Sequence, residues 1–180
     1  MDTALPTRME ANPIDKSRGR GQGRDVTAFV MPEAVRPGDL VAVVAPSSPF
    51  GVDDFWRGLA WLRDRYRVLA SPAILERNAY LAGTDERRLA ELVRAFTTPD
   101  VRAIIAARGG YGATRIEADL PWNLLVSSPR WLVGFSDITA LHVRASTLGI
   151  ASVHAPHVTG LGRATPRIRA AFLRALERPA

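Results

Sequence analysis

The chain has 180 residues, enough for one domain with a buried core. Hydrophobic residues make up 47% and charged residues 23%, as in ordinary globular proteins. There is no cysteine, which excludes disulfides, thiolate metal sites and a cysteine nucleophile and is compatible with a reducing compartment. The net charge of +6 comes from arginines scattered along most of the chain, whereas a nucleic-acid interface should be clustered, so no nucleic-acid partner is expected.

Residues 1–34 are expected to form a disordered tail, because they are polar and show no apolar periodicity. Their segment SRGRGQGR could contact RNA or phosphate, but a solvated tail or a misassigned start codon explains it more simply. No apolar run approaches the roughly 20 residues of a membrane span, and the N-terminus lacks the apolar region of a secretory signal. We therefore expect no membrane partner, and the lack of cysteine is compatible with a cytoplasmic location.

Strand and helix patterns alternate after the tail. Apolar runs predict strands at 39–45, 67–70, 101–107, 130–135 and 151–154. Helical spacing predicts helices at 53–65, 85–97, 137–148 and 166–177, with weaker ones near 113–118 and 122–127. Thr84 is a suitable N-cap, and Pro166 suits a first helical turn. This alternation predicts an α/β fold, with a parallel flavodoxin-like or Rossmann-like sheet of about five strands and helices on both faces.

Two loops follow the carboxyl ends of predicted strands, RGGYG at 108–112 and GFSD at 134–137. Ligand sites in open α/β sheets lie at that edge. The backbone N–H groups of RGGYG could bind an anion, or its glycines could simply permit a tight turn. The loop matches neither G-x-G-x-x-G nor the P-loop, so a nucleotide site is not indicated.

Ser136 lies at a predicted strand-to-helix turn. There a hydroxyl is exposed and backbone N–H groups converge, which suits a nucleophile with an oxyanion hole. Ile138 interrupts the full G-x-S-x-G pattern. Taken alone, Ser136 would more often be a helix N-cap, but the glycine-rich loop at the same edge favours catalysis. Asp137 would stabilise the helix N-terminus through the helix dipole.

The three histidines offer no convincing general base. His142 follows Ser136 by six residues, which turns it away from the helix start and indicates a packed side chain. His154 and His157 could line a site or bind a metal, but no carboxylate cluster accompanies them, so no metal site is predicted. The residues alone therefore give a candidate nucleophile without its base.

Several segments resemble the N-terminal half of the LD-carboxypeptidase family, which includes muramoyltetrapeptide carboxypeptidases and microcin C immunity peptidases. They are RPGDLVAVVAPSSP (36–49), YLAGTDERRLAELVRAFTTPDVRAIIAARGGYGATR (80–115), LVGFSDITALH (132–142) and VHAP (153–156). They occur in family order, and the resemblance covers nearly everything from residue 35 to about residue 160.

The resemblance implies a serine peptidase with a Ser-Glu-His triad and no cofactor or metal. Its substrate is the amide bond between an L-residue and a terminal D-residue, as in murein tetrapeptide during peptidoglycan recycling. Ser136 matches the nucleophile, and the backbone N–H groups of Asp137 and Gly110 match the oxyanion hole. The residues then expected to contact the substrate are Arg108, Gly109 and Tyr111.

One departure from the family bears on activity. Family members have about twice this folded length, and the triad Glu and His belong to a second domain. His154 aligns with a histidine that is not the base, and Ala155 replaces the glycine usual in that motif. We therefore expect 35–180 to be the nucleophile domain with its C-terminal domain absent, and inactive alone.

The expected partners are a muropeptide or small peptide with a terminal D-residue, and a second copy of the chain or a C-terminal domain. The alternative is a catalytically dead domain of a truncated paralogue that binds muropeptides or another partner.

Overall fold

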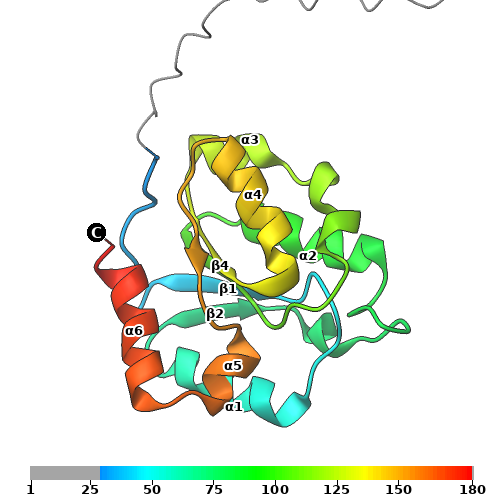
Figure 1. Ribbon diagram of the computed structural model, residues 1–180, viewed down its shortest axis with the longest axis horizontal. Coiled ribbons are helices and arrows are strands. Elements are labelled where there is room, and N and C mark those ends of the chain that lie inside the picture. The colour runs from blue at the N-terminus through cyan, green and yellow to red at the C-terminus, as the bar shows by residue number, and fades with distance from the viewer. Residues whose placement is uncertain (1–28, 180) are drawn as a thin grey trace, which may run out of the picture.

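The computed structural model describes residues 29–179, and its centre is a five-stranded parallel sheet of order β2-β1-β3-β4-β5 (Figure 1). The strand order reverses between β1 and β3, as in flavodoxin-like sheets, where ligands bind outside the carboxyl ends of the strands. The predicted α/β fold is confirmed. The strands are β1 (Leu40–Val44), β2 (Arg67–Ala70), β3 (Val101–Ala106), β4 (Trp131–Gly134) and β5 (Val153–His154).

Helices cover both faces of the sheet (Figure 1). On one face lie α1 (Val52–Arg63), α5 (Val158–Arg163) and α6 (Pro166–Glu177), and on the other α2 (Asp85–Thr97), α3 (Trp122–Ser127) and α4 (Thr139–Thr147). Short 3₁₀ turns are η1 (Pro72–Leu75), η2 (Ala113–Arg115), η3 (Glu117–Asp119) and η4 (Ser136–Ile138). No helix within residues 29–179 is long and apolar enough to span a bilayer.

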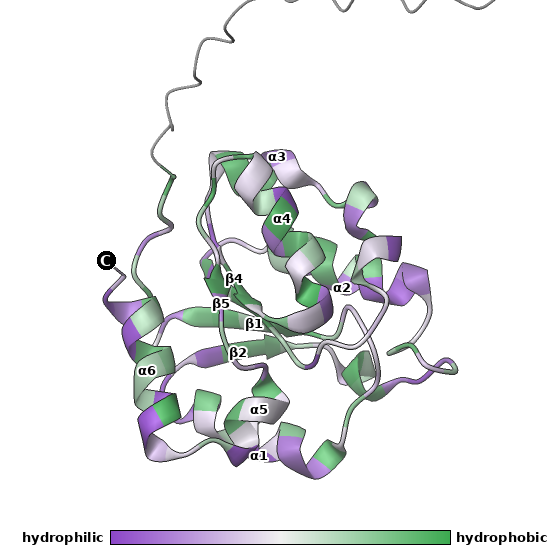
Figure 2. Cartoon of the chain, viewed as in Figure 1, coloured by the Kyte–Doolittle hydropathy of each residue, from purple (hydrophilic) through white to green (hydrophobic). Residues whose placement is uncertain are grey.

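The central strands supply side chains to two cores. In β1, Val41 and Val43 pack with α1, α5 and α6, whereas Ala42 and Val44 face α2 and α4. Strands covered on both faces must be apolar at nearly every position, which is why they appear as continuous runs in the sequence (Figure 2). The core therefore holds the carboxyl ends of β1, β3 and β4 side by side.

The packed domain begins earlier than expected. Residues 29–34 were assigned to the tail, but the Val30 N–H donates to the Gly149 carbonyl at 2.8 Å and the Ala151 N–H donates to Val30 at 3.0 Å. This single parallel bridge is too short to give a periodic apolar pattern, so the sequence offered no signal for it. The rest of the predicted tail, 1–28, lies outside the described residues.

Helix α5 was not predicted, because two of its six residues are glycines, which disfavour helix. One of them, Gly162, forms a close contact with α1 together with Gly58 of that helix. A Cβ on Gly162 would overlap the Asp54 carbonyl, and a Cβ on Gly58 would overlap the Val158 carbonyl. The two helix backbones therefore pack directly against each other, which fixes α5 beside the sheet edge.

We expect Gly162→Ala to lower the free energy of unfolding by about 2 kcal/mol, because the overlap forces α1 and α5 apart. The loss should occur although alanine otherwise favours helix over glycine by about 1 kcal/mol. Chemical denaturation measures it. Gly51→Ala is the control, because no atom lies within 4 Å of the added Cβ; since Gly51 is the N-cap of α1, where alanine is less favourable, the loss should stay below about 1 kcal/mol. Equal stability of both variants would contradict the close helix contact.

Candidate active site

Ser136 sits in a strained turn at the carboxyl end of β4. Its φ of 61° lies in the left-handed region, which residues other than glycine rarely adopt. The turn needs Gly134 before it, because a Cβ there would lie 2.9 Å from the Ile138 side chain. Strain of this kind persists only where the surrounding structure enforces it, and it is concentrated at functional sites.

The Ser136 hydroxyl does not act as a helix cap. Phe135 is the N-cap of η4 and Ile138 that of α4, and neither helix has a side-chain cap. Within residues 29–179, no hydrogen bond engages the hydroxyl, and the residue is exposed. The geometry therefore favours the nucleophile interpretation over the N-cap interpretation.

The RGGYG loop lies directly against this turn. A Cβ on Gly109 would lie 3.0 Å from the Ser136 Cβ and 3.0 Å from the His157 ring, so a larger residue would force these neighbours to move. Gly110 has a φ of 111°, and a Cβ there would overlap the Ser48 side chain. The glycines thus make the tight turn that was one reading of this motif, and the turn brings the loop to the serine.

Two backbone N–H groups beside Ser136 have no partner in the part of the chain that the structure describes. The Ser48 N–H donates to the Gly109 carbonyl at 3.2 Å, and in a trans peptide the Gly110 N–H points the opposite way. Within residues 29–179, neither the Gly110 N–H nor the Asp137 N–H donates a hydrogen bond. Unpaired donors on two adjoining loops are what an oxyanion hole requires.

The Asp137 side chain joins the loops that surround the serine. Its Oδ2 accepts hydrogen bonds from the Ser47 hydroxyl at 2.6 Å and from the Ala113 N–H at 2.8 Å. It therefore ties the loops after β1 and β3 to the turn after β4. The sequence predicts only an interaction of Asp137 with the helix dipole. It gives no sign of these hydrogen bonds, because Ser47 and Ala113 are remote from Asp137 in the sequence.

A cavity of about 250 Å³ opens beside Ser136. Gly110 and two of the predicted substrate contacts, Arg108 and Gly109, line it. Tyr111 does not: it is exposed and packs against Tyr80, with ring centroids 5.8 Å apart. The full lining is Arg108, Gly109, Gly110, Phe135, Ser136, His157, Thr159, Gly160 and Arg163.

Sequence reasoning missed the contribution of α5 to this cavity. Thr159, Gly160 and Arg163 were not considered, because α5 itself was not predicted. The one available signal was position, since the segment follows β5 at the edge where the other site loops lie. Arg163 and Arg108 give the cavity a positive rim, although Arg163 lies 3.3 Å from Asp54.

His157 supports the turn that carries Ser136. Its ring is buried and stacks on the Phe135 ring at a centroid distance of 4.1 Å. Its Nε2 lies 2.9 Å from the carbonyl oxygen and 3.2 Å from the nitrogen of Phe135. Burial lowers the pKa of His157 to about 4, so the ring is neutral at pH 7.

The other two histidines also leave Ser136 without a base. His142 Nε2 lies 3.0 Å from the Gly134 carbonyl and its Nδ1 2.9 Å from the Ser152 hydroxyl, so it is the packed side chain expected. His154 is exposed. In the part of the chain that the structure describes, no histidine or carboxylate bonds the Ser136 hydroxyl and no side-chain cluster could hold a metal.

Comparison with known proteins agrees with this geometry. The family model described as the LD-carboxypeptidase N-terminal domain matches residues 41–155. The chain belongs to the LD-carboxypeptidase family. The resemblance first seen in the RGGYG and GFSD segments is thus confirmed, and it concerns the N-terminal domain.

Several relatives share this region. The chain is 44% identical over 140 residues to a Streptomyces coelicolor protein named as a carboxypeptidase, covering 74% of this chain and 45% of that protein. It is 39% identical over 126 residues to the murein tetrapeptide carboxypeptidase of Pseudomonas aeruginosa, covering 68% and 40%. The crystal structure of the muramoyltetrapeptide carboxypeptidase from Oxalobacter formigenes superposes with a TM-score of 0.70 at 29% identity, covering 78% and 48%. The chain thus spans less than half the length of each.

We expect Asp137→Ala to lower the free energy of unfolding by about 1–3 kcal/mol, because it leaves the Ser47 and Ala113 donors unpaired. Asp137→Asn should lose less than half as much, because one amide oxygen can still accept both bonds. Urea denaturation of the three proteins gives the comparison. Equal losses for Ala and Asn would show that charge, rather than the shared acceptor, stabilises the loops.

His157 should titrate near pH 4, and NMR of its ring protons measures this. The folded state then binds fewer protons than the unfolded state between pH 6.5 and 4, so stability falls as pH falls through that window. His157→Gln should flatten this part of the pH–stability curve relative to the native chain, because other groups are common to both proteins. A midpoint near 6.5 would show that the ring is solvated.

Proposed function

We propose that this chain is the nucleophile domain of a serine-type LD-carboxypeptidase that hydrolyses the L–D amide bond of murein tetrapeptide in peptidoglycan recycling. The observation that carries the proposal is the position of Ser136, whose backbone is strained and whose hydroxyl caps no helix. Within residues 29–179, it lies beside the unpaired N–H groups of Gly110 and Asp137. The relatives named as murein peptide carboxypeptidases support the substrate class.

In the proposed mechanism, Ser136 Oγ attacks the carbonyl carbon of the scissile amide. The carbonyl oxygen becomes an oxyanion, which accepts hydrogen bonds from the Gly110 and Asp137 N–H groups. The amine of the D-residue then leaves with a proton, and water hydrolyses the resulting ester. A strained turn suits this role, because it holds the hydroxyl in place before substrate arrives.

The mechanism also needs a general base for the serine proton. His142 and His157 direct their Nε2 atoms at backbone groups, and the Asp137 carboxylate is occupied by Ser47 and Ala113. We therefore propose that the base comes from residues outside 29–179, supplied by a second domain or another chain.

Arg108 and Arg163 suit the recognition of a carboxypeptidase substrate. Such a substrate ends in a carboxylate, and both guanidinium groups border the cavity beside Ser136. Guanidinium groups bind carboxylates through charge-assisted hydrogen bonds. Tyr111 lies outside the cavity, so we propose that it contacts the more distant part of a peptide. We also propose that the protein is cytoplasmic. Its protein partner would be a second copy of the chain or a C-terminal domain.

A catalytically dead binding domain is the second candidate, and the missing base favours it. Such a domain would keep the cavity and its arginines and bind muropeptides without cleaving them. The two candidates predict the same binding and differ only in turnover once a base is supplied.

The test uses D-alanine release from murein tetrapeptide. The chain alone should release almost none, whereas a chimera continued by the remainder of the Pseudomonas aeruginosa relative should release it. Ser136→Ala should lower the chimera's rate by at least about a thousandfold, and Ser146→Ala, an exposed serine on α4, should leave it unchanged.

Two other results would contradict the proposal. An inactive, folded chimera that still binds tetrapeptide would identify a dead binding domain. Release by the chain alone that Ser136→Ala abolishes would show that the base lies within this sequence.

A further inference from the structure

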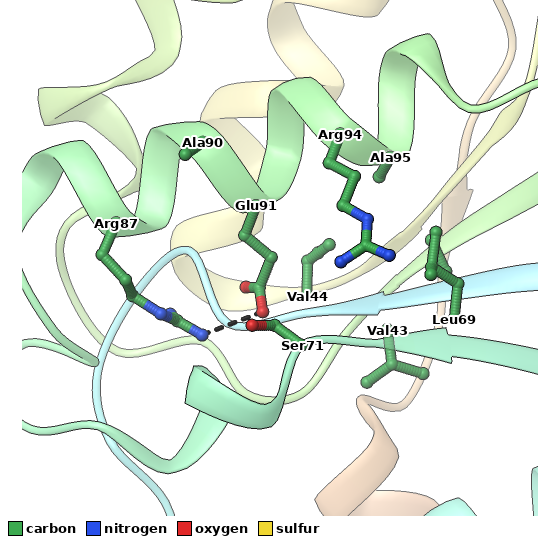
Figure 3. A pocket seen from close by; sticks show the side chains of 10 residues that line it. Val43, Val44, Leu69, Ser71, Arg87, Ala90, Glu91, Arg94 and Ala95 are labelled. Atoms are coloured by element: carbon green, nitrogen blue, oxygen red, sulfur yellow. Dashed lines mark hydrogen bonds and ion pairs between the residues drawn. The ribbon is translucent and has the colours of Figure 1, made fainter.

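A second cavity, of about 260 Å³, lies between α2 and the strands β1 and β2 (Figure 3). It shares no lining residue with the cavity beside Ser136. Its lining is Ala42, Val43, Val44, Leu69, Ser71, Arg87, Ala90, Glu91, Arg94 and Ala95.

The cavity exists because α2 covers β2 incompletely. β2 lies at one edge of the sheet, and its Leu69 remains half-buried. On α2, Ala90 and Ala95 are too small to fill the space above the strands. The floor and one wall are therefore apolar, as in most small-ligand sites, and the volume suits a small molecule.

The polar lining carries a net positive charge. Arg94 extends over the apolar floor, and within residues 29–179 its guanidinium forms no hydrogen bond or ion pair (Figure 3). Arg87 pairs with Glu91 at 2.8 Å, and Glu91 also accepts the Ala45 N–H at 2.6 Å. Burial raises the pKa of Glu91 to about 7, so its negative charge is incomplete at neutral pH.

We propose that this cavity binds a small amphipathic anion, with a carboxylate on Arg94 and a short apolar body over Leu69, Val44 and Ala90. An anion fits because the two arginines outweigh one carboxylate, and Arg94 has bonding capacity to spare. An apolar body fits because a fully polar ligand would lose water against the alanines and Leu69 without replacement hydrogen bonds. The site is independent of the peptidase proposal, since no catalytic residue lines it.

Arg87 and Glu91 give the cavity a path to the Ser136 site. Arg87 donates to the carbonyls of Ala45 and Ala82, and Glu91 holds the Ala45 N–H. Ala45 directly follows β1 and begins the loop whose Ser47 donates to Asp137. Arg87 and Glu91 therefore line the cavity and also fix the start of this loop.

The test is a titration of the folded chain with hexanoate, followed by methyl NMR. Saturable shifts should appear at Leu69, Val44 and Ala90. Hexan-1-ol, which has the same apolar chain without the charge, should bind about tenfold more weakly, as expected for the loss of one charge-assisted contact.

Variants locate the site. Arg94→Ala should weaken hexanoate binding about tenfold, Arg94→Lys should recover part of the loss, and Arg167→Ala, an exposed arginine on α6, should have no effect. Ala90→Phe fills the cavity from an exposed helix position and should abolish binding while the chain stays folded by circular dichroism. Absence of saturable shifts, equal affinity of the Arg94→Ala or Ala90→Phe chain, or equal binding of hexan-1-ol would overturn the proposal.

Discussion

The hydrogen bonds to the Asp137 carboxylate hold the site together. One oxygen accepts from Ser47 after β1 and from Ala113 beyond β3, while its own residue follows Ser136 after β4. Parallel strands bring their carboxyl ends to one edge but leave the loops free to diverge. A shared acceptor removes that freedom, so the Gly110 and Asp137 N–H groups lie on loops whose positions are mutually fixed. An oxyanion hole is effective only when its donors are already in place, so in the proposed function these hydrogen bonds would also support catalysis.

Helix α2 supports the same loops through its Arg88 side chain. Arg88 is fully buried and donates to the carbonyls of Pro46 and Gly112, and a Cβ on Gly112 would lie 2.6 Å from the Arg88 guanidinium. Asp85 pairs with Arg88 and compensates the charge. A buried guanidinium with backbone acceptors is costly to disturb, because losing one acceptor leaves a buried N–H donor of a charged group without a partner. The glycines of RGGYG are therefore needed for two reasons. Gly110 and Gly112 have backbone conformations that few other residues adopt, and Gly112 leaves space for the Arg88 guanidinium.

Much of this architecture could be predicted from the sequence, because its signals are local. The runs in β1 and β3 are apolar since both sheet faces are covered, and Thr84 caps α2 as its chemistry suggests. The parts that could not be predicted from the sequence are those that tertiary contacts stabilise. Helix α5 depends on glycine packing against α1, and Val30 joins the domain through a single bridge. Among the site residues, Ser136 and Gly110 could be found from the turn and the family motifs, whereas the roles of His157 and Ser47 depend on contacts across the sheet edge.

His157 shows why proximity to a serine does not make a histidine its base. It contacts the Gly109–Ser136 junction, yet its Nε2 faces the Phe135 backbone and its ring is stacked and buried. A general base must take a proton in the reaction, and a site that lowers the pKa to about 4 opposes the cationic form. The same burial suits a positioning role, since a neutral ring stacked on Phe135 supports the strained turn and would not compete for the carboxylate of the proposed substrate. In the proposed function, the proton acceptor for Ser136 would therefore have to approach from the exposed side of that residue.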